Sequence, residues 1–289
     1  MGKLFTRALD EKIIKKIKGE KLFSLLLRDI KEGTVFPAIR DNKIHFYHKG
    51  GRLFEYSEAG WVTNVFYISA DRDGEKWGDF NQKSLPELAK NFTEKSTFAE
   101  RYENIKRHCA DWNKQSESSE VSVLYDAHSY VASSNNIVVL DIESVFSSNS
   151  EEQVTDSSKK TDRIDMILFD KKNGVLQAVE AKLYENGELR GPVVNQINRY
   201  QKNIEKRKCE IVEAYNNYRD IVNNLFGLEL RPVKGINKNV KLLCFGFDEP
   251  NRISPKFKKI KSNLEEKLNK KNVRFIGSAK SLKKLESLI

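Results

Sequence analysis

The chain has 289 residues, of which 39% are aliphatic, aromatic or cysteine, so it can bury at least one hydrophobic core. Its three cysteines form no CxxC pair, no apolar run approaches the length of a membrane-spanning helix, and the N-terminus has no apolar stretch typical of a secretion signal. These features argue against a disulfide framework and a cysteine zinc site, and we expect a cytoplasmic protein with no membrane partner.

The net charge is +10, and most of it lies near the C-terminus. Residues 251–289 contain twelve Lys or Arg and three acidic residues, a net of +9 (12 − 3), so the other 250 residues are close to neutral (+10 − 9 = +1). A concentrated basic segment is typical of proteins that bind polyanions. Lys-rich helices that serve solubility alone have the same composition, and charge does not separate the two interpretations.

The first 115 residues predict an α+β module. Apolar residues first follow helical spacing and then alternate in a β-rich stretch, in which Lys49-Gly50-Gly51 predicts a hairpin turn. The aromatic residues of this hairpin, with the Arg and Lys residues near them, could stack on bases, but such residues more commonly form one side of a sheet core. The expected elements are a helix to Asp29–Ile30, strands Lys43–His48, Arg52–Tyr56 and Trp61–Ser69, a turn at 71–74, and a helix from Leu85 to about Trp112.

A polar stretch, Lys114–Ser119, marks the expected boundary between domains 1–115 and 116–289. The sequence of the second domain predicts an α/β core in the order helix, three-strand meander, long helix and strand, followed by basic elements. The expected elements are a helix Glu120–Val131, strands Asn136–Phe146, Arg163–Phe169 and Val175–Leu183 with a polar loop at 147–160, a long helix from Pro192 to Gly227, a strand Val240–Phe247, a basic helix from Pro255, a strand Val273–Ile276 and a last helix from Ala279.

Charged residues occur within two strands that are otherwise apolar. Asp165 is in RIDMILFD, and Glu180-Ala181-Lys182 is in LQAVEAKL, across a tight turn at Lys172–Gly174. Side chains alternate along a strand, so Glu180 and Lys182 lie on one face, and the hairpin brings Asp165 next to Glu180. Carboxylates suit a hard cation such as Mg²⁺, which offsets phosphate charge and lowers the pKa of a bound water, while an amine can position that water.

Asp165 followed by Glu180-Ala181-Lys182 resembles the signature of the PD-(D/E)xK nuclease superfamily, an acid on one strand and (D/E)xK on the next. The resemblance covers roughly residues 117–250 and implies a restriction-endonuclease-like core that hydrolyses phosphodiester bonds. It implies Asp165 and Glu180 as Mg²⁺ ligands, with the backbone carbonyl of Ala181 as a further ligand and Mn²⁺ as a substitute metal. Lys182 would orient the attacking water or stabilise the transition state. The chain departs from the strict pattern because Ile164, and not proline, precedes Asp165.

Two further elements extend this resemblance. Gln196 and Tyr200 form a QxxxY in the helix after the ExK strand, as in the RecB-like branch of the superfamily, where these residues support the active site and contact DNA. Their spacing of four places them on one helical face, although an ordinary amphipathic helix with a core tyrosine has the same spacing. The superfamily also has a glutamate on the helix before the first core strand, and Glu120 is the expected metal ligand there. The competing candidates for that glutamate are Glu100, Glu103 and Glu143.

The expected function is therefore Mg²⁺-dependent cleavage of nucleic acid, with DNA as the expected substrate, in a setting such as bacterial defence, restriction or phage biology. Lys258, Lys259 and Lys261 would contact phosphate, and the N-terminal module would recognise the substrate or bind a second copy or a partner protein. Two alternatives from other classes stay open. One is a non-catalytic nucleic-acid-binding module, and the other is a protein-interaction scaffold that retains the nuclease fold.

Overall fold

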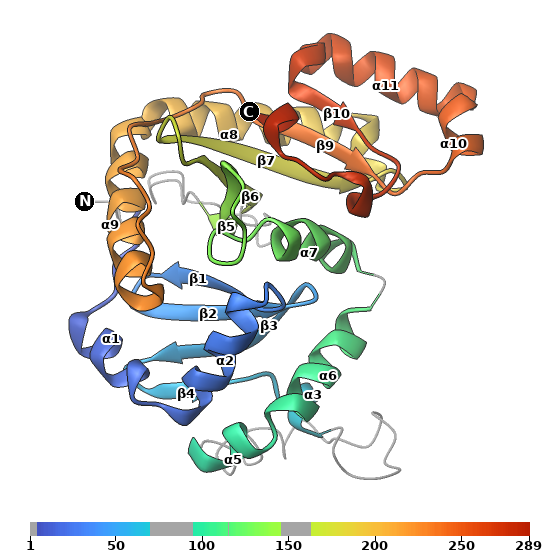
Figure 1. Cartoon of the computed structure of the whole chain (residues 1–289). Helices are drawn as coiled ribbons and strands as arrows, with labels where there is room; N and C mark the ends of the chain where they lie inside the picture. The colour runs from blue at the N-terminus through green and yellow to red at the C-terminus, as the bar shows by residue number, and fades with distance from the viewer. Residues whose placement is uncertain (1–4, 70–94, 115, 146–162) are drawn as a thin grey trace, which may run out of the picture. The chain divides into compact units, whose positions relative to one another are not determined.

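The structure of the protein, a computed structural model, describes residues 5–69, 95–114, 116–145 and 163–289 (Figure 1). These residues form two compact units. Unit 1 takes its described residues from 1–6, 133–220 and 229–289, and unit 2 takes them from 7–132 and 221–228. No helix in the described ranges is long and apolar enough to cross a membrane.

Unit 2 is built on an antiparallel sheet in the order β1-β2-β3-β4. Its central hairpin has the predicted turn, which is tight because Lys49 and Gly50 both adopt positive φ, 48° and 84°. The strands are β1 (Phe36–Arg40), β2 (Lys43–His48), β3 (Gly51–Ser57) and β4 (Gly60–Val62), and the helices are α1 (Glu11–Lys18), α2 (Lys21–Lys31), α3 (Val65–Ser69), α5 (Lys95–Glu100), α6 (Tyr102–Asn113) and α7 (Glu117–Ala127).

The aromatic residues of this sheet form the core of unit 2. Phe46, Phe54 and Tyr56 have no exposed surface, and Tyr47 and Trp61 are 5% and 4% exposed. The rings of Tyr56 and Trp61 lie 4.6 Å apart. The interpretation of these residues as one side of a sheet core is confirmed, and they present no open ring face on which a nucleobase could stack.

Several elements of unit 2 differ from the prediction. The strand expected over Trp61–Ser69 is wrong beyond Val62, because the Asn64 side chain accepts a hydrogen bond from the backbone N of Phe66 at 3.1 Å and starts helix α3. The first predicted helix is two helices, α1 and α2, because α1 ends at Gly19. The helix expected from Leu85 is present as α5 and α6. The predicted turn at 71–74, the loop at 147–160 and residues 85–94 lie outside the described residues.

Helix α7 was expected in the second domain but belongs to unit 2. The Tyr125 hydroxyl accepts a hydrogen bond from the backbone N of Gly50 at 3.0 Å, and Asp126 pairs with Lys49 at 3.0 Å. These contacts attach α7 to the β2–β3 turn. The units therefore divide near residues 132/133, later than the expected boundary at 115/116.

Unit 1 is a mixed α/β fold on a sheet with the order β10-β9-β7-β6-β5, and β8 pairs with β7. The predicted antiparallel meander is present in β5, β6 and β7, whereas β9 runs parallel to β7 and β10 runs parallel to β9. The central strand β7 therefore pairs on both sides. The strands are β5 (Ile137–Val145), β6 (Arg163–Asp170), β7 (Val175–Leu183), β8 (Gly235–Ile236), β9 (Lys241–Phe245) and β10 (Val273–Phe275).

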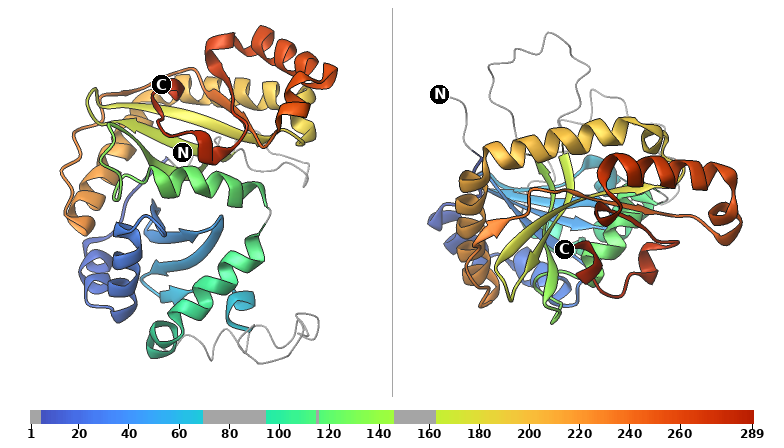
Figure 2. Two further views of the ribbon diagram at one scale, coloured as in Figure 1. Left: turned by 45° about the vertical axis from the view of Figure 1, so that its right-hand side comes forward. Right: turned by 90° about the horizontal axis from the view of Figure 1, so that it is seen from above.

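Helices α8 (Pro192–Lys206) and α11 (Pro255–Leu268) lie on the same side of this sheet (Figure 2). Each begins with a proline at a position where the missing N–H costs nothing. The single long helix expected from Pro192 to Gly227 is wrong, because the chain leaves helical geometry at Arg207 and continues as α9 (Lys208–Phe226). The guanidinium of Arg207 binds Glu210 at 2.8 and 2.6 Å, which stabilises the start of α9.

The C-terminal helix expected from Ala279 is also wrong. The chain there forms two short 3₁₀ turns, Ala279–Ser281 and Glu286–Leu288, because Leu282 adopts a non-helical ψ of 86° between them. The basic helix α11 and the strand β10 are present near their predicted positions. A short helix, α10 (Glu249–Ile253), precedes α11.

The turn between β6 and β7 determines how these two strands pair. The Asp170 side chain accepts hydrogen bonds from the backbone N of Lys172 and of Asn173, at 2.9 and 3.0 Å, and Gly174 completes the turn with a φ of 73°. The ladder begins at Asp170 opposite Val175 and runs to Met166 opposite Val179. The paired register ends one residue short of Asp165 on β6 and one residue short of Glu180 on β7.

Candidate active site

The predicted juxtaposition of Asp165 with Glu180-Ala181-Lys182 is present at the end of the β6–β7 ladder. The Oδ2 atom of Asp165 accepts a hydrogen bond from the backbone N of Ala181 at 2.7 Å. Glu180 has no exposed surface, Lys182 is 7% exposed, and Asp165 is partly exposed. The two strands therefore hold a buried carboxylate and a buried ammonium next to a carboxylate that solvent can reach.

Lys182 lies between two carboxylates. Its Nζ atom is 2.8 Å from Oε1 of Glu180 and 3.2 Å from Oε2 of Glu188. Glu188 belongs to a 3₁₀ turn after β7, η1 (Gly187–Arg190), which starts where the Asn186 side chain accepts a hydrogen bond from the backbone N of Glu188 at 2.9 Å. Sequence reasoning missed Glu188, because an acid in a polar turn carries no motif. Its only signal is its closeness in sequence to Lys182.

Carboxylate oxygens are donors that a hard divalent cation such as Mg²⁺ prefers. Asp165, Glu180 and Glu188 with Lys182 carry a net charge of −2 (−3 + 1), which such an ion would offset. The described residues contain no group of three or more His, Cys, Asp or Glu side chains that could hold a metal ion. On strands β6 and β7, the oxygen atoms that could bind a metal ion belong to the carboxylates of Asp165 and Glu180 and to the backbone carbonyl of Ala181. That set suits Mg²⁺, which usually keeps several waters and binds through one or two carboxylates.

Gln196 and Tyr200 support strand β6 through hydrogen bonds. Tyr200 is 1% exposed, and its hydroxyl donates a hydrogen bond to the backbone O of Arg163 at 2.5 Å. The Gln196 amide donates to the same hydroxyl at 2.7 Å. The expected contact between the Tyr200 side chain and nucleic acid conflicts with this burial. Both residues instead connect helix α8 to the strand position two residues before Asp165.

The expected helix ligand, Glu120, lies on an exposed face of α7 in unit 2, whereas Asp165 and Glu180 lie in unit 1. A competing candidate, Glu143, lies on β5. The register pairs Ile142 with Met166 and Ser144 with Ile164, so Glu143 is across from Asp165.

Glu143 has a positive φ of 46°, a conformation that costs energy for a residue with a side chain. Its carboxylate binds the Arg163 guanidinium at 3.2 Å. Since Arg163 and Asp165 are two apart on β6, their side chains share a face of the sheet. Glu143 therefore lies on the same side of the sheet as Asp165, one strand away.

A second buried carboxylate on β5, Asp141, has a structural explanation. Asp141 has no exposed surface and accepts hydrogen bonds from the backbone N of Ile142 at 2.8 Å, the Ser144 hydroxyl at 2.9 Å and the Tyr215 hydroxyl at 3.0 Å. Buried polar groups that are fully hydrogen-bonded fix packing. Asp141 therefore ties β5 to helix α9.

The three lysines expected to contact phosphate lie on α11. Lys258 and Lys259 are exposed, whereas Lys261 is half-buried and pairs with Glu265 at 3.2 Å. The apolar side of the helix, with Phe257, Ile260 and Leu264, is buried. Lys258 and Lys259 are thus available to a polyanion, whereas Lys261 would have to leave Glu265 to bind a phosphate.

Comparison of the chain with protein-family models, with curated protein sequences and with solved structures gives no match.

Proposed function

We propose that unit 1 has a restriction-endonuclease-like core and that the protein is a metal-dependent nuclease acting on nucleic acid, with DNA as the expected substrate. The observation that carries this proposal is the convergence of Asp165 with Glu180-Ala181-Lys182. These residues come from neighbouring strands of an antiparallel meander and meet where Asp165 Oδ2 lies 2.7 Å from the Ala181 N. Charged residues within largely apolar strands are costly to bury, so they need a compensating partner or a function.

In this proposal Asp165, Glu180 and the carbonyl of Ala181 would hold a Mg²⁺ ion. The bound ion would offset phosphate charge and lower the pKa of the attacking water. Lys182 lies beside Glu180 at 2.8 Å and can orient that water or stabilise charge on the phosphate. Glu188 binds the same ammonium at 3.2 Å and is its second carboxylate partner.

The position of Asp165 depends on strand β6. The Tyr200 hydroxyl binds the backbone of this strand at Arg163, and Gln196 binds the hydroxyl. Small displacements of a catalytic group lower rates strongly, so these contacts support activity without touching substrate. Gln196 and Tyr200 are therefore positioning residues in this proposal.

The test is cleavage of single- and double-stranded DNA and RNA by the purified full chain. We expect cleavage with Mg²⁺ or Mn²⁺, little with Ca²⁺, which takes more ligands at longer distances, and none in excess chelator. Glu180→Ala should abolish cleavage. It should keep the folded circular dichroism spectrum, because Glu188 still pairs with the buried Lys182 ammonium at 3.2 Å and the cation is not left without a partner.

Glu205→Ala, at an exposed position on α8, is the matched control and should cut at the wild-type rate. Undiminished turnover in chelator, or wild-type turnover by folded Glu180→Ala, would refute the nuclease assignment. Metal-independent binding without any cleavage would instead favour a non-catalytic nucleic-acid-binding module.

A further inference from the structure

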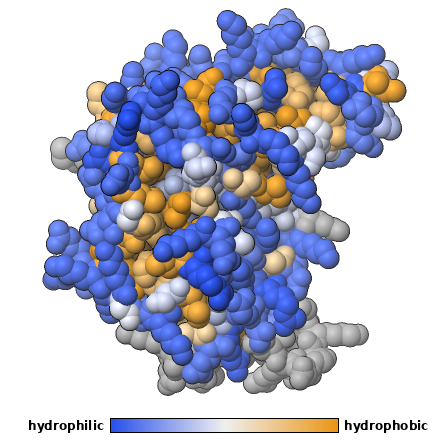
Figure 3. All heavy atoms as spheres, viewed as in Figure 1, coloured by the Kyte–Doolittle hydropathy of each residue, from blue (hydrophilic) through white to orange (hydrophobic). Residues whose placement is uncertain are grey.

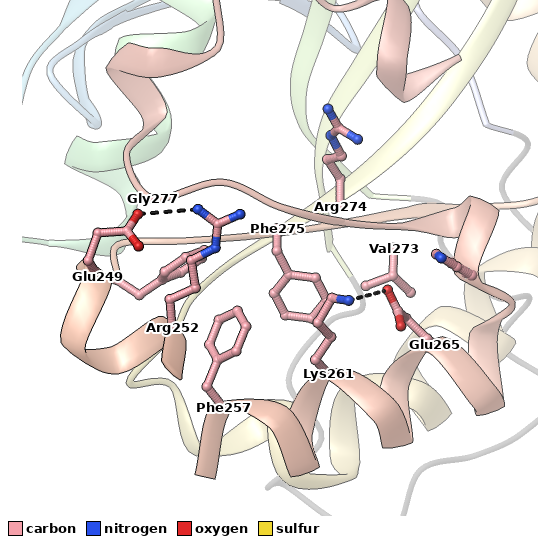
Figure 4. Close-up of a pocket in the computed structure, with 11 residues that line it drawn as sticks. Glu249, Arg252, Phe257, Lys261, Glu265, Val273, Arg274, Phe275 and Gly277 are labelled. Carbon is pink, nitrogen blue, oxygen red and sulfur yellow. Dashed lines mark hydrogen bonds and ion pairs between the residues drawn. The ribbon is translucent and has the colours of Figure 1, made fainter. Parts of the chain in front are cut away.

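A pocket of about 320 Å³ lies between α10, α11 and β10 in unit 1 (Figure 4). Its apolar side chains are Val273 and the rings of Phe247, Phe257 and Phe275. Phe257 is 4% exposed, and the other two rings are half-buried. The volume is within the range of small-molecule sites, which begins at about 300 Å³.

The three rings are tilted against one another. Phe247 and Phe257 lie 4.8 Å apart at an interplanar angle of 57°, and Phe257 and Phe275 lie 5.4 Å apart at 63°. Neither pair is stacked face to face. Phe257 on α11 and Phe275 on β10 project into the same space, whereas Arg274 points to the opposite side of the strand (Figure 4).

Charged residues surround these rings. Arg252 pairs with Glu249 at 3.2 Å, and Lys261 pairs with Glu265 at 3.2 Å. Lys270 lines the same pocket and has no carboxylate partner among the described residues. In the space-filling view, hydrophilic residues flank hydrophobic ones over this part of unit 1 (Figure 3). Exposed ion pairs contribute little stability, so these cations can exchange a carboxylate for a phosphate at low cost.

We infer that this pocket binds one unpaired nucleotide of a nucleic-acid strand. The base stacks on the half-buried rings of Phe247 and Phe275, and its phosphate binds Lys270 and Lys261. An aromatic floor with cations at the rim is the combination that single-stranded nucleic acid uses, because each base has a π-face and each nucleotide a phosphate. In a duplex the base faces are covered by stacking. The inference deepens the proposed nuclease function and rests on it for the identity of the polymer.

The pocket is joined to the candidate active site through one aromatic residue. Tyr184 follows β7 directly, two residues after Lys182, and its ring lies 5.6 Å from that of Phe257. Lys256 lies over the Tyr184 ring at 5.2 Å and pairs with Glu185 at 3.3 Å. A nucleic-acid strand whose nucleotide is bound in the pocket is therefore held next to the segment that carries Lys182.

The test measures binding by the full chain in excess chelator, so that it does not depend on cleavage. The probes are a short fluorescent oligothymidylate, a duplex of the same length, and thymidine monophosphate as competitor. Phe275→Leu keeps an apolar side chain but removes the ring, and should weaken oligothymidylate binding about tenfold, as loss of one base stack predicts. Lys270→Gln should weaken it as well. Both variants should bind the duplex nearly as the wild type does.

Lys259→Gln removes the same charge from an exposed position on α11 that does not line the pocket, and is the matched control. It should weaken single- and double-stranded binding alike. Unchanged oligothymidylate binding by folded Phe275→Leu and Lys270→Gln would overturn the inference, and so would an equal loss on duplex. Thymidine monophosphate that binds as tightly as the oligonucleotide would identify a free nucleotide as the ligand and overturn the strand as occupant. A failure of cleavage with these binding differences intact would count against the nuclease and not against the pocket.

Discussion

Asp126 and Glu180 are both carboxylates held away from water, but their surroundings differ. Glu180 pairs with Lys182, which is itself buried. Asp126 pairs through Oδ2 with the half-exposed Lys49, and its buried Oδ1 atom has no hydrogen-bond partner among the described residues. Burial therefore raises the pKa of Asp126 to about 6, although the Lys49 ammonium opposes the shift. The charged form of Asp126 is the costly one.

The raised pKa of Asp126 predicts a pH dependence of stability. The folded chain holds this proton more tightly than the unfolded chain, whose carboxyl titrates near 3.8, so the contribution of Asp126 to stability falls as pH rises from about 4 to 6. Asp126→Asn removes this titration. We expect its free energy of unfolding, relative to wild type, to be higher at pH 7 than at pH 4 by about 1–3 kcal/mol.

Urea unfolding of both proteins at the two pH values measures this difference. Asp111→Asn, at an exposed position on α6, should show no such change. A wild-type-minus-variant difference that is the same at both pH values would contradict the assignment.

Glu143 and Glu120 can be separated as the third acid of the proposed site. Glu143 lies across from Asp165 in the sheet, whereas Glu120 is exposed on α7 in the other unit. We expect Glu143→Gln to raise the Mg²⁺ concentration for half-maximal cleavage about tenfold, because a nearby carboxylate favours a bound cation, and Glu120→Gln to leave it unchanged. Metal titration of the cleavage rate measures both. A raised Mg²⁺ requirement in Glu120→Gln and an unchanged one in Glu143→Gln would instead identify Glu120 as the third acid.

At the scale of elements, Tyr200 joins α8 to β6, and a substitution there shows whether this side chain supports the strand or contacts the substrate. Tyr200→Phe deletes the hydroxyl that donates to the Arg163 backbone and accepts from Gln196. The loss of these two hydrogen bonds should lower the free energy of unfolding by about 1–3 kcal/mol and lower the cleavage rate, with little change in affinity for nucleic acid. Thermal unfolding, kinetics and a binding titration measure the three quantities. Weaker binding at unchanged stability would instead indicate direct contact.

The sequence predicted those elements whose apolar pattern is local. The strands β6 and β7 lie where they were expected, and their pairing follows from the turn chemistry of Asp170 and Gly174. The alternation along these strands was enough to predict that Asp165 and Glu180 lie together. The chemical nature of the donors at the candidate site therefore follows from the local sequence pattern.

Other elements depend on contacts that the sequence pattern does not contain. The helical pattern continues through Arg207, but the chain leaves helical geometry there, and the Arg207 side chain pairs with Glu210 at the start of α9. Helix α7 belongs to unit 2 because of contacts with Lys49 and Gly50, which are distant in the chain. The polar stretch at 114–119 resembled a linker, but Ser116 caps α7 by accepting from the backbone N of Ser119. Helix starts and linkers are rich in the same polar residues, so composition does not distinguish them.

At the scale of the whole molecule, the C-terminal charge predicts the salt dependence of binding. Neutralising Lys258, Lys259 and Lys261 to glutamine should flatten the plot of log affinity against log salt by about 0.9 for each lysine that touches duplex phosphate, so by roughly two units for the exposed Lys258 and Lys259. Binding to all sequences should weaken alike, and cleavage at saturating substrate should change little, because interactions made only in the transition state are untouched. An unchanged slope would assign the basic segment to solubility.

Helix α9 has a consequence for any attempt to divide this chain. Its residues up to Asp220 belong to unit 1, and the turns from Ile221 onward belong to unit 2, where the Phe226 ring lies 6.5 Å from that of Phe23. The chain passes between the units at 6/7, 132/133, 220/221 and 228/229. A fragment ending at residue 132 would lack the aromatic ring that covers Phe23. The coding sequences of the two units therefore alternate along the gene. A gene fusion, domain swap or recombination event would have to transfer both units together.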